Sequence, residues 1–326
     1  MDETIQRCLH LIEVGAEQSH RNMTLYCLLA ARDCGVDFLT LDEALDKQAL
    51  TITEVSEGGS VPQLRVVNKS DQKVLIMDGE ELAGAKQNRV LNVTVLIAPL
   101  SETIIPVSCV EQRRWSYKDK EFRSESRSMS PRMKQKKTES VTVSLDMDDS
   151  FKADQRLVWD EVEAKYARMA TPVSPTLAMA DLYESHRNSA DDYLQAFHSL
   201  DNQIGMIVFI DGKVAGMEML GTFSAFASVH KKLVHSYVMD ALETVVAETE
   251  DKTRNSQSES AQVLESAKNA AVQKRQSVAL GQDIRLESNH VVGAGLEFEG
   301  QVLQMSIFLQ NDQSRGTRRG AMRRAS

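Results

Sequence analysis

Three segments of the chain share one pattern, in which an apolar run leads into an acidic residue, a glycine and a second run. They are VLIMDGEEL, IVFIDGKVA and LEFEGQVLQ. An acidic residue before glycine is typical of the short turn of a β-hairpin, because that turn needs positive φ angles, which glycine adopts without strain. The pattern therefore predicts antiparallel sheet, with hairpins over residues 205–220 and 296–310. The segments are too short to establish an internal repeat.

Apolar residues at helical spacing predict helices among these strands. A capping box of Thr40 and Glu43 predicts a short helix over TLDEALDKQA. Residues 223–245 carry the apolar stripe of a long amphipathic helix, and a second helix should end near Arg275. Strands are expected at residues 50–56, 63–68 and 73–77. The predicted fold class is α+β, with a β-rich N-terminal half that has one short helix and a C-terminal half of helices plus antiparallel hairpins.

Length and local composition predict the domain organisation. A chain of 326 residues with 42% hydrophobic content can bury a substantial core. We expect a β-rich half over residues 1–111 that carries most of the candidate site, and a helical and hairpin half over 151–311 that packs with it as one unit. A basic mobile loop or linker is expected over residues 112–150, and a disordered basic tail over 312–326.

The chain lacks the sequence signals of membrane insertion and secretion. No run approaches the roughly 18 apolar residues that a membrane helix needs, and the N-terminus lacks the basic and then apolar pattern of a secretory signal. A cytoplasmic location without membrane contact is therefore expected. Four cysteines are too few for a disulfide framework, and Cys27 and Cys34 are too far apart for a structural zinc pair. The sequence indicates no metal and does not identify a cofactor.

The formal net charge of −9 conceals two basic segments. Residues 112–137 carry ten lysines and arginines against three acidic residues, and residues 315–324 carry five arginines. Two interpretations of these segments stay open. In the first they are a solvent-exposed loop and tail, and in the second they are basic arms that bind nucleic acid through its phosphates.

Residues 78–115 combine polar side chains with apolar strands, and such a grouping is typical of a functional site. The apolar runs are residues 90–97 and 103–110. The candidate side chains that bracket them are Glu80, Glu81, Lys86, Gln87, Asn88, Arg89, Asn92, Cys109, Glu111, Arg114 and Trp115. In an extended chain, Lys86, Asn88 and Asn92 would share one face, and Cys109 and Glu111 would share a face of the next strand. Pro106 predicts that this second strand is an edge strand or carries a bulge.

The residue types in this stretch predict their roles. Lys86, Arg89 and Arg114 suit phosphate, and Trp115 suits stacking on a base. The amides of Gln87, Asn88 and Asn92 suit ribose or base. Glu81 and Glu111 are candidate general bases, with Glu80 and Cys109 as further possible site residues. The alternatives are that Lys86 and Arg89 pair with Glu80 or Glu81, and that Cys109 is a small core residue.

The amino-acid sequence of this stretch resembles that of one known family. GEELAGAKQNRVLN at residues 79–92, IPVSCVEQRRW at 105–115 and HSYVMDAL at 235–242 are similar to the ARG and Rhodanese-Phosphatase-superfamily-associated protein domain, a bacterial family of largely uncharacterised function. FLTLDEAL, ITEV and VPQLRVVN extend the resemblance over most of the chain. Arg113 departs from it, since glycine is expected before the arginine and tryptophan pair. The resemblance implies a place in the metabolism of ADP-ribose or other NAD-derived compounds.

Together, the residues and the resemblance predict one leading function and two alternatives. The leading hypothesis is the binding or processing of a small phosphorylated, nucleotide-like ligand, most directly ADP-ribose or an NAD-derived compound, in one pocket. The first alternative is a non-catalytic nucleic-acid-binding protein that uses residues 112–137 and 315–324. The second is a scaffold or partner-binding subunit, in which the charged residues form internal ion pairs.

Overall fold

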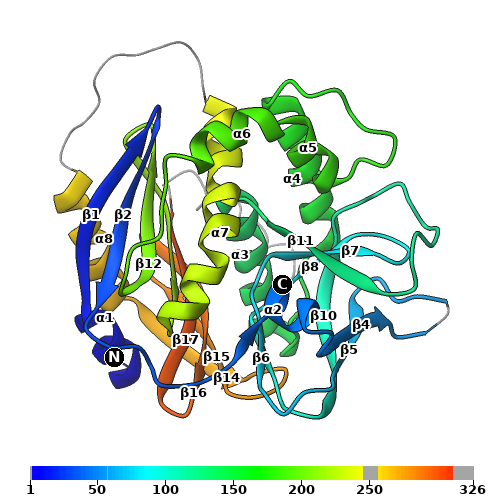
Figure 1. Ribbon diagram of the computed structural model, residues 1–326, viewed down its shortest axis with the longest axis horizontal. Coiled ribbons are helices and arrows are strands. Elements are labelled where there is room, and N and C mark those ends of the chain that lie inside the picture. Colours follow the sequence, from blue (N-terminus) through cyan, green and yellow to red (C-terminus); the bar gives the residue numbers. More distant parts are fainter. Residues whose placement is uncertain (1, 57, 245–255, 311–326) are drawn as a thin grey trace.

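The computed structural model describes residues 2–56, 58–244 and 256–310, which form an α+β fold (Figure 1). Its larger sheet is antiparallel throughout and has the strand order β1-β2-β12-β13-β17-β16-β15-β14. The strands are β1 (Ile12–His20), β2 (Met23–Ala30), β12 (Gln203–Ile210), β13 (Lys213–Leu220), β14 (Ala271–Gln276), β15 (Gln282–Glu287), β16 (Val291–Phe298) and β17 (Gln301–Leu309). Both predicted C-terminal hairpins are present, as β12–β13 and β16–β17.

A second sheet curls into a barrel. Its order is β11-β7-β8-β10-β5-β4, and the two outer strands meet, with an isolated bridge between Thr53 of β4 and Glu121, the residue before β11. Gly84 permits this closure, because it has φ +135° and a Cβ there would lie 2.6 Å from the Glu121 carbonyl oxygen. The strands are β4 (Leu50–Glu54), β5 (Gln63–Asn68), β7 (Glu80–Gly84), β8 (Arg89–Leu91), β10 (Ser101–Cys109) and β11 (Phe122–Ser128).

A small third sheet and helix α2 cover one side of the barrel. The sheet consists of β3 (Leu39–Thr40), β6 (Val74–Ile76) and β9 (Val95–Ile97), and its β3–β6 pair is parallel. Helix α2 (Leu41–Asp46) begins with the predicted capping box of Thr40 and Glu43. Leu41 and Ala44 of this helix are buried in the same apolar cluster as the barrel interior.

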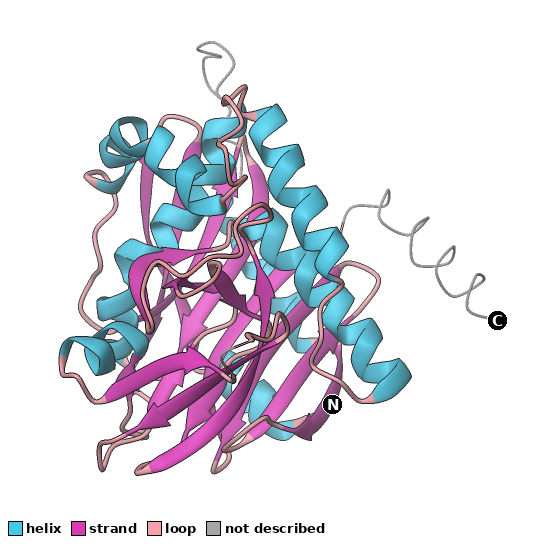
Figure 2. Ribbon diagram, turned by 90° about the vertical axis from the view of Figure 1, so that its right-hand side faces the viewer, coloured by secondary structure: helices cyan, strands magenta, loops and turns pink. Residues whose placement is uncertain are grey.

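The remaining helices surround the two sheets, and α4 and α5 among them pack against the barrel (Figures 1 and 2). Helix α7 runs between the larger sheet and the barrel, and it contacts β12 and β13 on one side and β11 on the other. Helices α1 and α8 pack on the opposite face of the sheet. The helix bounds are α1 (Glu3–His10), α3 (Pro131–Asp148), α4 (Gln155–Arg168), α5 (Met179–Ser185), α6 (Arg187–Leu194), α7 (Phe223–Thr244) and α8 (Ser256–Lys268).

Charged side chains are buried between the larger sheet and the barrel. Lys134 of α3 pairs with Glu218 of β13 at 2.9 Å, and Lys137 pairs with Asp78 and donates to the Asn92 carbonyl. Lys232 of α7 pairs with Glu80, and all of these ionic groups are at most 3% exposed. We call these three pairs the buried ion-pair layer. They connect helices α3 and α7 to both sheets.

The structure corrects the prediction of a loop over residues 112–150. Phe122–Ser128 is strand β11 and Pro131–Asp148 is helix α3, so irregular structure is confined mainly to the segment before β11. Low apolar content misled the prediction, because Lys134 and Lys137 of this helix are buried through ion pairs rather than exposed. The tail from residue 311 onward lies outside the described residues.

Four further differences concern individual elements. The run from Lys86 is two short strands, β8 and β9, rather than one. Strand β10 is not an edge strand, since residues up to Pro106 pair with β5 and the residues after it pair with β8. Helix α8 ends at Lys268, and residues 271–276 form strand β14. Helix α1 was not expected, although Asp2 caps it and Ile5 and Leu9 are buried one turn apart.

Candidate functional site

The inner face of the barrel is apolar along most of its length and charged at one end. Arg89, the first residue of β8, lies opposite Cys109, the last residue of β10. Glu54 ends β4, on the same face as the buried residues Leu50 and Ile52. The antiparallel registers bring these three strand ends together. We call this end the barrel mouth and define it by Glu54, Lys86, Arg89, Cys109 and Trp115.

Arg89 is fully buried in the barrel mouth and only partly hydrogen-bonded. Its Nη1 donates to the carbonyl of Gln87 at 3.1 Å and to the Gln87 side-chain oxygen at 3.2 Å. Its Nε and Nη2 have no hydrogen-bond partner in the described part of the chain. Burial lowers the pKa of Arg89 from its usual value. Gln87 therefore fixes one end of a guanidinium whose other donors are unused.

Glu54 faces the unused side of that guanidinium. Its Oε1 lies 3.8 Å from Arg89 Nη2, which is too long for a hydrogen bond, and Oε1 makes none to any described residue. The other oxygen accepts from the Ser60 backbone N–H at 3.4 Å. The sequence analysis missed Glu54. A signal was present, because Glu54 continues the inward spacing of Leu50 and Ile52 along β4.

Lys86 and Trp115 form the outer part of the barrel mouth. The Lys86 ammonium donates to the Gly58 carbonyl at 2.6 Å and lies 5.2 Å from the Trp115 ring centroid and 5.1 Å from that of Tyr117. The Trp115 ring also lies 5.8 Å from the guanidinium carbon of Arg89 and is 49% exposed. Such distances are typical of cation–π contacts. Trp115 thus lies between Arg89 and solvent.

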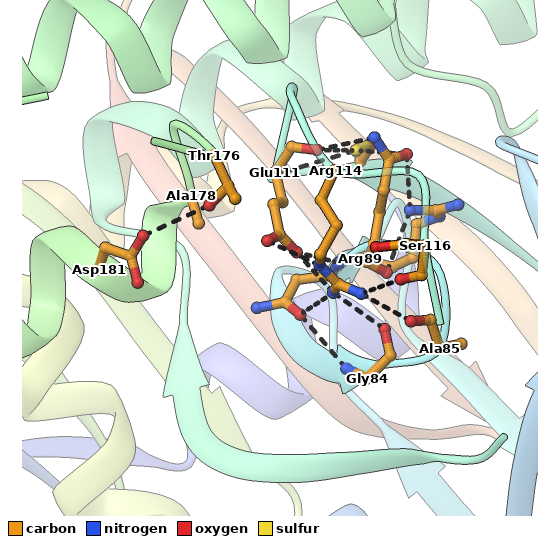
Figure 3. A network of polar contacts seen from close by, with 12 residues as sticks. Gly84, Ala85, Arg89, Glu111, Arg114, Ser116, Thr176, Ala178 and Asp181 are labelled. Carbon is orange, nitrogen blue, oxygen red and sulfur yellow. Dashed lines mark hydrogen bonds and ion pairs between the residues drawn. The ribbon is translucent and has the colours of Figure 1, made fainter. Parts of the chain in front are cut away.

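Arg114 and Glu111 form a hydrogen-bonded frame next to the barrel mouth (Figure 3). Arg114 donates to both carboxylate oxygens of Glu111, at 2.8 and 2.6 Å. Its other acceptors are the carbonyls of Gly84, Ala85 and Ser116 and the side-chain oxygen of Asn88. All three guanidinium nitrogens therefore bond to protein. Because Gln87 donates to the Glu111 carbonyl at 2.8 Å, the frame also positions Gln87 and, through it, Arg89.

The two candidate general bases have opposite pKa shifts. Burial raises the pKa of Glu81 to about 7, although Arg127 and Asn88 act to lower it. Burial also acts to raise the pKa of Glu111, but the hydrogen bonds from Arg114 and Asn88 outweigh it and hold that pKa below its usual value. Glu81 accepts from the Asn88 amide at 3.1 Å, and its other oxygen has no hydrogen-bond partner among the described residues. Glu81 pairs in register with Val90, so it faces the helices rather than the barrel interior.

Cys109 is a buried thiol within this hydrogen-bonded network. Its Sγ donates to the Gln87 side-chain oxygen at 3.1 Å. Burial raises the pKa of Cys109, although the nearby Arg89 acts to lower it. A buried thiol with a raised pKa is a poor nucleophile. Its geometry supports a packing role.

Besides Glu81, two further predicted site residues lie away from the barrel mouth. The Asn92 side chain accepts from Ser108 Oγ at 2.7 Å and donates to the Phe151 carbonyl at 3.0 Å. Glu80 belongs to the buried ion-pair layer and accepts from the Met77 backbone N–H at 2.7 Å. The structure therefore brings together Lys86, Gln87, Arg89, Cys109 and Trp115, with Asn88, Glu111 and Arg114 in the adjoining frame.

Most cations of the basic segment over residues 112–137 have acidic partners. Arg123 pairs with Asp119 and Glu125, Lys134 and Lys137 lie in the buried ion-pair layer, and Arg127 lies 3.7 Å from Glu81. Arg132 and Lys136 both pair with Glu161. These cations therefore have acidic partners within the fold, although the single carboxylate of Glu161 serves two of them. The second basic cluster, residues 315–324, lies outside the described residues.

The fold and site together define an α+β protein in which one end of a small barrel is enclosed by basic and aromatic side chains. The chain belongs to the ARG and Rhodanese-Phosphatase-superfamily-associated Protein domain family, whose model matches residues 11–308. No match is found among curated proteins or among solved structures. No helix in the described ranges combines the length and apolar character needed to cross a bilayer. Nor do those ranges contain three or more His, Cys, Asp or Glu side chains grouped as metal ligands.

Proposed function

We propose that the protein binds a small phosphorylated, nucleotide-like ligand at the barrel mouth. The observation that carries the proposal is Arg89, a fully buried guanidinium with two nitrogens that lack hydrogen-bond partners among the described residues. A buried donor without a partner costs about 1–3 kcal/mol, and more when it is charged. Oxygen atoms of a ligand would supply the missing acceptors.

The surrounding side chains match the remaining parts of such a ligand. Lys86 offers an ammonium at the outer edge of the barrel mouth, which suits a phosphate group. Trp115 offers a half-exposed ring, which suits stacking on a base. Since the unpaired nitrogens of Arg89 are shielded from solvent, the ligand must displace the Trp115 ring to reach them. The family resemblance makes ADP-ribose the first compound to test.

The proposal concerns binding and assigns no reaction. Glu81 and Arg89 project from opposite faces of the barrel sheet, because Arg89 pairs with Leu82 and Glu81 pairs with Val90. One small ligand at the barrel mouth therefore does not reach Glu81. Both carboxylate oxygens of Glu111 already accept hydrogen bonds from Arg114 or from the Asn88 backbone N–H. The catalytic roles predicted for Glu81 and Glu111 stay predictions outside this proposal.

Isothermal titration calorimetry with ADP-ribose, AMP and inorganic phosphate tests the proposal. We expect at least one compound to bind the wild type and Arg89→Leu to weaken that binding by at least about tenfold. Arg65→Leu is the matched control, because Arg65 is a half-exposed arginine on the same barrel that pairs with Glu102. Binding that survives Arg89→Leu unchanged, or the failure of all three compounds to bind, would contradict the proposal.

A further inference from the structure

We infer that Glu54 and Arg89 act together as a recognition site for a hydroxyl group, so that the ligand at the barrel mouth is a hydroxyl-bearing sugar phosphate. The inference rests on the proposed function and names the specificity of the same site. It assigns Glu54 a role in choosing the ligand. It also gives Arg89 a hydroxyl rather than the phosphate as its partner.

The first support is the geometry of the pair. Glu54 Oε1 and Arg89 Nη2 are 3.8 Å apart, and neither atom has a hydrogen-bond partner among the described residues. Two hydrogen bonds of about 2.8 Å span more than this gap, so one oxygen atom beside the pair can bond to both atoms. That oxygen must accept from Arg89 and donate to Glu54. A hydroxyl does both, whereas a fully ionised phosphate has no proton to donate.

The second support is charge. A phosphate dianion on Arg89 would lie within a few ångströms of the Glu54 carboxylate, and like charges at that distance repel strongly in a buried site. The other Glu54 oxygen accepts a hydrogen bond from the Ser60 backbone N–H at 3.4 Å. The ammonium of Lys86, whose contacts are the Gly58 carbonyl and two aromatic rings, provides a cationic position for the phosphate further out.

The third support is the rigidity of the pair. Gln87 holds the Nη1 end of Arg89 with two hydrogen bonds, and the Glu111–Arg114 frame holds Gln87. Arg89 therefore cannot rotate freely to find another acceptor, and the Ser60 backbone N–H also holds one oxygen of Glu54. A site built around a hydroxyl discriminates strongly against an analogue that lacks it, because the buried polar groups then stay unpaired.

The test compares AMP with 2′-deoxy-AMP, 3′-deoxy-AMP and inorganic phosphate by calorimetry. For the wild type we expect one of the deoxy analogues to bind at least about tenfold more weakly than AMP, and phosphate to bind more weakly than AMP. Glu54→Gln should reduce this discrimination to about threefold or less and should strengthen phosphate binding, since it removes the repelling charge. Glu102→Gln, an exposed carboxylate on the same barrel, is the matched control and should retain the wild-type pattern.

The outcomes separate the inference from the proposed function. Equal binding of AMP and both deoxy analogues by the wild type would overturn the inference alone and would assign the gap between Glu54 and Arg89 to water. Discrimination that persists in Glu54→Gln would also overturn it. If ADP-ribose and these four compounds all fail to bind, the proposed function fails and the inference fails with it. Should Glu54→Gln not fold, Glu54→Asp retains the charge but shortens its reach, and reduced discrimination is again the expected result.

Discussion

Arg89 in the barrel mouth and Lys137 in the buried ion-pair layer are both fully buried cations, yet their surroundings differ. Lys137 has a carboxylate partner in Asp78 and a carbonyl acceptor in Asn92. Arg89 has its nearest carboxylate beyond hydrogen-bond distance and two nitrogens without partners among the described residues. Burial alone does not distinguish a cation with a structural role from one that binds a ligand. The two are distinguished by how many hydrogen bonds and ion pairs the protein itself makes to the cation.

The largest loss of stability is expected from a substitution that breaks the buried ion-pair layer. Lys137→Ala leaves the Asp78 carboxylate buried without its cation, and removing one partner of a buried pair costs about 3–5 kcal/mol. We expect a loss of that size in the free energy of unfolding measured with urea. Lys136→Ala is the control and should cost at most about 1 kcal/mol, because Lys136 is 41% exposed. Equal losses in the two variants would show that the layer does not carry this stability.

The second prediction concerns a buried acidic side chain, Glu81, in place of a buried cation. Burial raises the pKa of Glu81 to about 7, above its usual 4.5, so the folded state binds the proton more tightly than the unfolded state. This contribution to stability is full below about pH 4.5 and is lost as the pH rises toward and through 7. The loss amounts to about 3 kcal/mol.

Urea unfolding at several pH values between 5 and 8 measures this effect. The glutamine side chain in Glu81→Gln is uncharged at every pH. The free energy of unfolding of this variant should therefore increase relative to that of the wild type as the pH rises. Parallel pH profiles for the two proteins would exclude a buried, protonated Glu81.

Arg89→Leu should have a much smaller effect on stability than Lys137→Ala. It removes the two hydrogen bonds to Gln87 but also ends the burial of unpaired charged donors, and these contributions oppose each other. We expect the free energy of unfolding to change by no more than about 1 kcal/mol, while ligand binding is lost. A loss as large as that of Lys137→Ala would mean that Arg89 is a structural charge.

The smallest effect is expected at the surface. Arg123 is 64% exposed, and of its partners Glu125 lies on the same strand and Asp119 in the segment just before it. Exposed pairs of this kind contribute about 0–1 kcal/mol, so Arg123→Ala should change the free energy of unfolding by about 0.5 kcal/mol or less. A change above about 2 kcal/mol would show that ion-pair strength in this protein does not follow burial.

Local sequence signals predicted the elements that local interactions determine. The capping box of α2, the turns of the β12–β13 and β16–β17 hairpins and the apolar stripe of α7 are all contained within short stretches of chain. The α+β class followed from these elements. The predicted site was also partly brought together, since Lys86, Arg89 and Trp115 are neighbours in the structure.

Long-range pairing was not predictable in the same way. Closure of the barrel depends on Thr53 meeting Glu121, and burial of α3 depends on Glu218 and Asp78 neutralising its lysines. When the acidic partners of a basic run are distant in sequence, the run is interpreted as a solvent-exposed segment. The sequence likewise assigned phosphate to Arg114. Its guanidinium instead donates to Glu111, three residues earlier, and to the backbone carbonyls of Gly84 and Ala85, which are 30 and 29 residues away along the chain.

The strand order of the larger sheet determines the order in which the protein can be completed during synthesis. Barrel strands β4 to β11 come from one continuous part of the chain, residues 50–128, whereas β2 pairs with β12, with Cys27 opposite Met206. At about 5–20 residues per second, β12 leaves the ribosome on the order of ten to forty seconds after β2. During that interval the β1–β2 hairpin is without its neighbour, while the barrel already has all of its strands. The edge of β2 that later pairs with β12 therefore stays unpaired until the C-terminal half is made.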